Sequence, residues 1–150
     1  MSDNQRFRPP LWLKVWNKVF IQLSRLGFSF GREGPAVLMV PGRKSGKPRS
    51  TPVTPMTVDG KRYVVGFTSS DWAKNIRAAG EITLSRGRTS ERARIVEVPV
   101  DESRPLLRAW PTEVPASIGF VKRAGVVTEG RPEEFEALAG QCAVFRLDPI

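Results

Sequence analysis

The sequence predicts a mainly β protein with helices, an α+β domain built on an antiparallel barrel of about six strands. Short apolar and β-branched runs alternate with turn signals, and no strand–helix–strand unit repeats along the 150 residues. Thirteen glycines and thirteen prolines are typical of many turns and short elements. A chain of this length forms one domain that can bury its own core. Helices are expected to pack outside the barrel.

Residues 1–30 are expected to form a polar tail and an amphipathic helix that precede the barrel domain, residues 31–150. Apolar side chains recur at helical spacing over residues 11–26, and Lys14, Lys18 and Arg25 lie opposite them. Two tryptophans, three cations and no acid also suit the plane of a membrane interface. Packing on the domain or on a second subunit, and peripheral contact with a membrane, both stay open.

Three extended segments are expected in the first half of the barrel. Ala36–Val40 is predicted to be a buried strand. Residues 51–58 follow a basic loop and are extended, and their two prolines restrict them to an edge or a bulged position. Asp59-Gly60 is a hairpin signal, and residues 61–67 return as a β-branched and aromatic strand. These segments are predicted to form one continuous β-meander.

A short helix, a second hairpin and further helices are expected in the second half. The helix covers Trp72–Ala79, with hydroxyls and a capping carboxylate before it and Gly80 at its end. Residues 81–86 and 92–100 are predicted to form the second hairpin. The remaining elements are a helix from Asp101 or Ser103 through Trp110 that Pro111 and Pro115 break, helices over residues 116–124 and 131–140, and a closing strand over residues 142–147.

The stretch from Gly42 to Val53 differs from the rest of the chain in its charge. It contains four basic residues, two glycines, two prolines and three hydroxyls, but no acid. Uncovered main-chain N–H groups and clustered cations bind anions well. The stretch therefore predicts a loop that grips a polyanionic ligand, and a solvated basic loop is the alternative.

This loop does not match the nucleotide-hydrolysing P-loop, G-x-x-x-x-G-K-[ST]. Gly42 and Gly46 have three residues between them instead of four, and Pro48 stands where the motif needs a hydroxyl. The next segment is extended, whereas a P-loop leads into a helix. No G-x-G-x-x-G occurs either, which disfavours kinase-type and Rossmann readings.

The composition excludes several kinds of catalytic site. The chain has a net charge of +9, one cysteine and no histidine. Ser-His-Asp and Cys-His arrangements and most zinc sites are therefore absent, and Cys142 is predicted to be a small core residue. No signal peptide or run of ~20 apolar residues is visible. We expect a cytoplasmic protein in a reducing compartment, and any enzyme chemistry to come from a cofactor.

Several of these motifs resemble the deazaflavin-dependent nitroreductase family, the split β-barrel oxidoreductases that use coenzyme F420. The similarity is strongest at residues 42–53, and it continues at Gly60–Val65 and at Trp72-x-x-Asn75-x-x-Ala78. The closing strand, residues 144–147, is also similar in residue type to the closing strand of this family. The resemblance implies a split β-barrel. It also implies transfer of a hydride from reduced F420 to a small conjugated acceptor such as a quinone, an enone or a nitro compound.

The resemblance also implies a cofactor site, because F420 carries a phosphate and an oligoglutamate tail. The residues that would hold these anionic groups are Arg43, Lys44, Ser45, Gly46, Lys47 and Arg49. Main-chain groups of Ser50, Thr51, Pro52 and Val53 would run under the ring. The residues that would complete the pocket are Thr68, Ser69, Ser70, Trp72, Lys74, Asn75 and Arg77. No catalytic residue and no metal site is assigned.

The chain departs from this family on the substrate side. Members that act on nitroaromatic prodrugs carry several tyrosines near the substrate, whereas this chain has only Tyr63, in a predicted strand. A split-barrel protein that binds F420 or another lipophilic anion without turnover is therefore an alternative, as is FMN in place of F420. Nucleic acid is not expected as a partner, because no aromatic residue lies between Phe30 and Tyr63. A homodimer and a peripheral place on the inner face of the cell membrane stay open.

Overall fold

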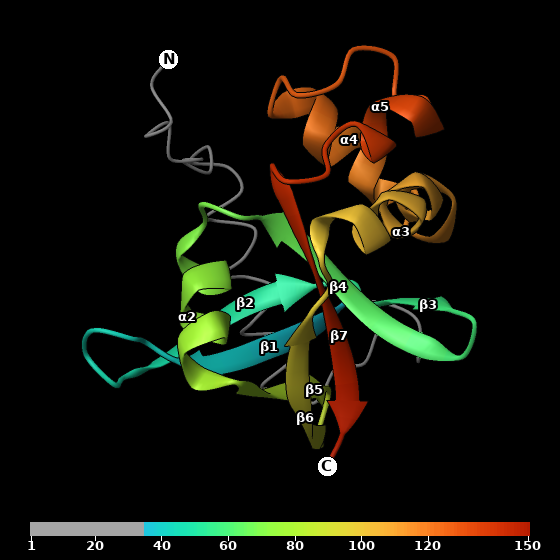
Figure 1. Ribbon diagram of the computed structural model, residues 1–150. Helices are drawn as coiled ribbons and strands as arrows, with labels where there is room; N and C mark the ends of the chain where they lie inside the picture. The colour runs from blue at the N-terminus through green and yellow to red at the C-terminus, as the bar shows by residue number, and fades with distance from the viewer. Residues whose placement is uncertain (1–34) are drawn as a thin grey trace.

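The computed structural model describes residues 35–150, so the helix expected over residues 11–26 lies outside the described part of the chain. Residues 35–150 form seven strands and four helices (Figure 1). In chain order these are β1 (Ala36–Pro41), β2 (Pro48–Val53), β3 (Met56–Val58), β4 (Lys61–Phe67), α2 (Asp71–Ala79), β5 (Glu81–Arg86), β6 (Thr89–Glu97), α3 (Val100–Glu113), α4 (Ala116–Arg123), α5 (Pro132–Glu136) and β7 (Cys142–Pro149).

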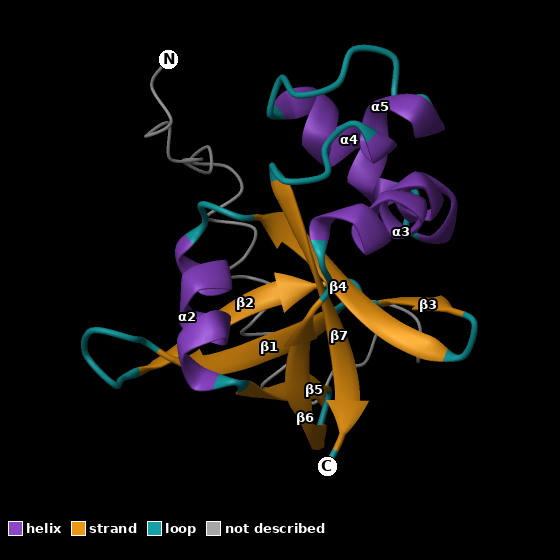
Figure 2. Ribbon diagram, viewed as in Figure 1, coloured by secondary structure: helices purple, strands orange, loops and turns teal. Residues whose placement is uncertain are grey.

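All seven strands belong to one sheet, in the order β2-β1-β5-β6-β7-β4-β3, and every pairing in it is antiparallel. The sheet curls into a half-barrel, with α2 on one side and α3, α4 and α5 gathered at the far end (Figure 2). The predicted antiparallel α+β barrel is confirmed, with seven strands instead of about six.

The predicted continuous meander is wrong. The hairpins β1–β2 and β3–β4 lie at opposite edges of the sheet. This is because β1 pairs with β5 on the side away from β2, and β4 pairs with β7 on the side away from β3. Thr54 and Pro55 carry the chain from one edge strand to the other. Pro52 lies in β2 at the sheet edge, where its missing N–H costs no ladder bond to a further strand.

The sheet is covered on both faces by separate apolar clusters. Adjacent residues on β7 point to different faces, so Phe145 joins the cluster under α2 and Val144 joins the cluster under α3, α4 and α5. The first cluster contains Leu38, Val64 and Ile76, and the second contains Leu107, Trp110 and Phe135. Trp72 and Ile76, one turn apart on α2, form the inner face of this helix against the first cluster.

Two helices differ in extent from the sequence prediction. α3 continues through Pro111 to Glu113, and Pro111 is buried. Trp110 packs edge-on against Phe135 with ring centroids 5.8 Å apart, so tertiary packing outweighs the usual cost of a proline within a helix. α5 ends at Glu136 instead of near residue 140, because Leu138 and Ala139 make tighter bonds to the carbonyl three residues back.

A carboxylate clasp holds the loop that precedes α5. One oxygen of Glu134 accepts the amides of Glu129, Gly130 and Arg131 at 3.0, 2.9 and 3.2 Å. The other accepts the amide of Thr128 at 2.6 Å and its hydroxyl at 3.2 Å. These hydrogen bonds lower the pKa of Glu134 from 4.5 to about 2, and the bond from the Thr128 amide contributes most to this shift.

Glu134→Gln should therefore destabilise the fold at neutral pH and flatten its acid dependence. The pKa of Glu134 is lower in the folded than in the unfolded chain, so the carboxylate stabilises the fold fully above its ordinary pKa of 4.5, and this contribution is lost as the pH falls toward 2. Urea unfolding at successive pH values measures the effect. Glu113→Gln is the control, since Glu113 makes no ion pair within residues 35–150. Identical pH profiles for Glu134→Gln and the parent would contradict the clasp.

Candidate functional site

The basic loop, residues 42–49, comprises the closed turn that connects β1 to β2 and the first two residues of β2. The amide of Gly42 donates to the Lys47 carbonyl and the amide of Gly46 donates to the Gly42 carbonyl, each at 2.8 Å. The hydroxyl of Ser45 accepts the Lys47 amide at 3.2 Å. Gly46 has φ +73°, a conformation that favours glycine. The loop is therefore shaped by its own main chain and exposed to solvent on the outside.

The basic loop presents donors that have no acceptor in the described part of the chain. The side chains of Lys44, Lys47 and Arg49 are exposed and make no ion pair within residues 35–150. The amides of Lys44 and Ser45 have no hydrogen-bond acceptor in that range either. Consecutive free amides beside three cations suit a phosphate or a carboxylate. The residues present thus fit an anionic ligand.

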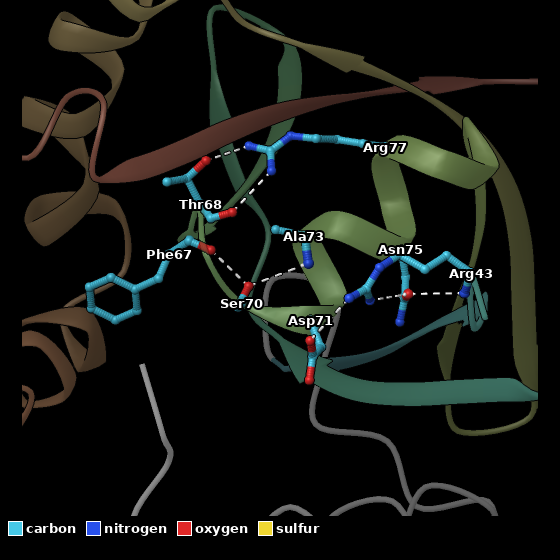
Figure 3. A network of polar contacts seen from close by, with 8 residues as sticks. All are labelled: Arg43, Phe67, Thr68, Ser70, Asp71, Ala73, Asn75 and Arg77. Carbon is cyan, nitrogen blue, oxygen red and sulfur yellow. Dashed lines mark hydrogen bonds and ion pairs between the residues drawn. The ribbon is translucent and has the colours of Figure 1, made fainter. Parts of the chain in front are cut away.

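Arg43 behaves differently from the other cations of the basic loop, since it reaches back to α2 (Figure 3). Its amide and its Nη1 both donate to Oδ1 of Asn75, at 3.0 and 2.9 Å. Its Nη2 lies 3.5 Å from a carboxylate oxygen of Asp71. Asn75 is buried, at 6% exposed. Arg43 therefore fastens the basic loop to the helix.

The segment before α2 is held from two sides. Ser70 caps the helix: its hydroxyl accepts the Ala73 amide at 3.3 Å and donates to the Phe67 carbonyl at 2.7 Å (Figure 3). Thr68 receives two bonds from Arg77, at 3.0 Å to its carbonyl and 2.6 Å to its hydroxyl. The segment is thus pinned at its first residue and at its last.

Arg77 is not a free cation. Its Nε and Nη2 donate to the two oxygens of Glu97 on β6 at 2.8 and 2.9 Å, and its guanidinium lies 5.5 Å from the ring centroid of Phe145. The hydrogen bonding that Arg77 donates to the Glu97 carboxylate is the largest cause that raises the pKa of Arg77. Lys74, one turn earlier, is half-buried and makes no ion pair within residues 35–150. The two cations predicted on this helix therefore have different environments.

The structure brings two of the three predicted parts of the site together. The basic loop and α2 meet at Asn75. The third part, Ser50–Val53, runs along edge strand β2, half-buried, in register with Met39 to Ala36 of β1. No hydrogen bond or ion pair within residues 35–150 joins those four residues to Thr68–Ser70, so that part of the predicted pocket stays a prediction.

Three structurally important residues escaped the sequence reasoning as site residues. Glu97 neutralises Arg77 from 20 positions away, and Asp71, expected only as a cap, also reaches Arg43. Gly66 lies in β4 directly under Trp72: a Cβ added there would come 1.9 Å from Cζ2 of Trp72. An isolated glycine within a strand signals such a close approach, whereas nothing local in the sequence marks Glu97.

Among residues 35–150, the single cysteine is buried and no cluster of metal ligands is present. Cys142 is buried, and desolvation raises the pKa of its thiol to about 12. Residues 35–150 contain no group of three or more His, Cys, Asp or Glu side chains that could hold a metal ion. Within the same residues, no helix is long and apolar enough to cross a membrane.

Comparison with known proteins gives a family match and fold matches. The family model described as F420H(2)-dependent quinone reductase matches residues 20–128. No curated protein matches the sequence. Among solved structures, a protein of unknown function from Agrobacterium tumefaciens has a TM-score of 0.57 at 13% identity, over 95% of this chain and 57% of its own. This chain thus spans little more than half the length of that protein.

Two further solved structures share the fold. A structure described as a domain-swapped dimer has a TM-score of 0.56 at 15% identity, over 91% of this chain and 97% of its own. A structure of an F420-H2 dependent reductase has a TM-score of 0.50 at 15% identity, over 76% of this chain and 93% of its own. These likenesses show the split-barrel fold. With the family match they confirm the predicted resemblance to F420-dependent split-barrel oxidoreductases, while its nitroreductase part stays a prediction.

Gly66→Ala should destabilise the protein by about 1–3 kcal/mol, because the new methyl group displaces the Trp72 ring from β4. Tryptophan fluorescence and urea unfolding measure the change. Gly119→Ala is the matched control: nothing lies within 4 Å of its added Cβ, and the helix α4 should gain up to ~1 kcal/mol. Equal stability of the two variants would contradict the tight contact.

A double-mutant cycle on Arg77→Gln and Glu97→Gln should give a coupling energy of about 0.5–1 kcal/mol, the range for half-exposed ion pairs. Arg77→Gln should cost more than Glu97→Gln, because Arg77 also holds Thr68. The coupling should shrink in high salt. Purely additive effects would show that the pair does not stabilise the turn before α2.

Proposed function

Because the chain belongs to the F420H(2)-dependent quinone reductase family and is thus an F420-dependent oxidoreductase, we propose that it reduces a small conjugated acceptor by two electrons. A quinone is the leading acceptor, and enones and nitro compounds are the others. Bound reduced F420 supplies the hydride. The observation that supports this proposal is the set of unpaired donors on the basic loop, which suits a polyanionic cofactor.

The proposed cofactor site begins at the basic loop. Lys44, Lys47 and Arg49, with the free amides of Lys44 and Ser45, bind the phosphate and the carboxylates of the tail. Gly46 gives the loop its turn, and Arg43 contributes to the site through its contacts to α2. Cations at an exposed loop tip cost little to hold together while water screens them.

The redox ring is proposed to lie along β2. Ser50, Thr51, Pro52 and Val53 form an edge strand, so one row of their main-chain groups has no strand partner within residues 35–150. Main-chain donors and acceptors of this kind orient a flat heterocycle without a titratable side chain. The proposed pocket is completed from the α2 side by Thr68, Ser69, Ser70, Trp72, Lys74, Asn75 and Arg77.

The acceptor side favours a quinone or an enone over a nitroaromatic compound. The chain has one tyrosine, Tyr63, which is 9% exposed and packs in the cluster under α3, α4 and α5. Its ring is therefore committed to the core. The side chains near the proposed site are proposed to bind the acceptor, orient it and exclude water. Few of these side chains could exchange a proton at neutral pH.

The wider context is also proposed. Residues 31–150 are proposed to be the cofactor-binding domain of a cytoplasmic protein. The membrane contact predicted from the sequence of residues 11–26 lies outside the described residues and stays a prediction, one that would suit a lipophilic quinone. A homodimer is supported by the neighbour described as a domain-swapped dimer.

Lys47→Ala and Arg49→Ala should each weaken binding of oxidised F420 roughly tenfold at low salt, the loss expected for one charge-assisted contact. Fluorescence titration measures Kd, and the dependence of Kd on salt should become shallower in both variants. Lys122→Ala is the control, because it makes the same change in charge on α4, outside the proposed cofactor site. A parent protein that binds no F420 at micromolar concentration would overturn the proposed site.

An acceptor screen with reduced F420 tests the reaction itself. Turnover should be fastest with quinones or enones and slow with nitro compounds. Normal F420 binding without turnover on any of the three classes would favour the non-catalytic alternative. Tighter binding of FMN than of F420 would contradict the assigned cofactor.

A further inference from the structure

The buried side-chain amide of Asn75 joins the basic loop to α2. Oδ1 of Asn75 accepts both the main-chain N–H of Arg43 and its Nη1, at 3.0 and 2.9 Å (Figure 3). Both partners are N–H donors, so the accepting atom of the amide has to be its oxygen, whose two lone pairs serve both bonds. Arg43, the second residue of the loop, is thereby fixed in main chain and side chain at once.

The contact between Arg43 and Asn75 leaves the next main-chain donors of the loop without an acceptor within residues 35–150. Arg43 uses its amide on Asn75, whereas the next two amides, of Lys44 and Ser45, have no acceptor within residues 35–150. Gly42, at the base of the loop, is closed in: an added Cβ would lie 3.2 Å from the Ser45 hydroxyl and 3.4 Å from Nε of Arg49. Fixing the base in this way fixes the direction in which the free amides point.

We propose that Asn75 is a positioning residue that pre-organises the basic loop for the anionic groups of the cofactor, through Arg43 and without a contact of its own to the phosphate or tail. The inference rests on the proposed function. A loop that is already docked loses less conformational freedom when it binds, so the docking raises affinity. Asn75→Ala removes the acceptor and leaves both Arg43 donors without it.

The salt dependence of F420 binding distinguishes this positioning role from direct contact with the ligand. Asn75 is neutral, so its loss should weaken F420 binding by the same factor at every salt concentration. Lys47→Ala removes a cation that meets the ligand, so its effect should fade as salt rises. Arg43→Lys keeps the charge and loses the planar fork that reaches Asn75 and Asp71, and it should therefore behave like Asn75→Ala.

The experiment measures the Kd of oxidised F420 between low and high salt for the parent, Asn75→Ala, Arg43→Lys and Lys47→Ala. We expect Asn75→Ala and Arg43→Lys to weaken binding roughly five- to tenfold with the salt dependence of the parent. Gln141→Ala, which removes an exposed amide, is the control and should bind as the parent does. Parent-like affinity in Asn75→Ala, or a shallower salt dependence, would overturn the inference.

Limited trypsin digestion without cofactor gives a second readout that is independent of F420. Undocking should speed cleavage after Arg43 and Lys44 in Asn75→Ala, while cleavage elsewhere and the urea midpoint change little. Unchanged cleavage of the loop would overturn the inference even if affinity fell. If the parent binds no F420, the proposed function fails, whereas the digestion still decides whether Asn75 docks the loop.

Discussion

The position of α2 depends on the contact between the Trp72 ring and the bare backbone of Gly66. A side chain at position 66 would overlap the ring, so only glycine lets the first turn of the helix lie this close to β4. The ring also packs at a tilt against Phe145, with centroids 6.1 Å apart. Because α2 carries Asn75 and Arg77, this one contact decides where the basic loop and the turn at Thr68 are fastened.

The cations around α2 divide into two groups with different tasks. Arg43 and Arg77 use their planar forks on oxygen atoms of the protein itself, those of Asn75, Asp71, Thr68 and Glu97. Lys44, Lys47 and Arg49 project outward with no acidic partner within residues 35–150. The first group builds the scaffold, and the second gives the loop its unbalanced charge. A positive charge that the protein leaves unpaired is available to a ligand.

The sequence predicted the local features and missed the long-range ones. The stop at Gly80 and the hairpin at Asp59-Gly60 are decided by neighbouring residues, and both are confirmed. The predicted capping carboxylate is corrected by one position, because the hydroxyl of Ser70 caps the helix and Asp71 lies in its first turn. The opposite placement of β2 and β3 depends on pairing with β5 and β7, which no local signal encodes. Pro111 within α3 and Glu97 beside Arg77 were likewise decided by packing partners 20 or more residues away. The basic loop was predictable as an anion site, but the use of Arg43 as a fastener was not.

The burial of Cys142 bears on how the protein tolerates the compounds that it is proposed to reduce. Quinones and enones are electrophiles that alkylate thiolates, and the thiolate is the reactive form of cysteine. The chain has one cysteine, that residue is 2% exposed, and desolvation raises the pKa of its thiol to about 12. At neutral pH this thiol stays protonated and shielded under α3, α4 and α5. The protein thus carries no accessible thiolate on which its own acceptors could form a dead-end adduct.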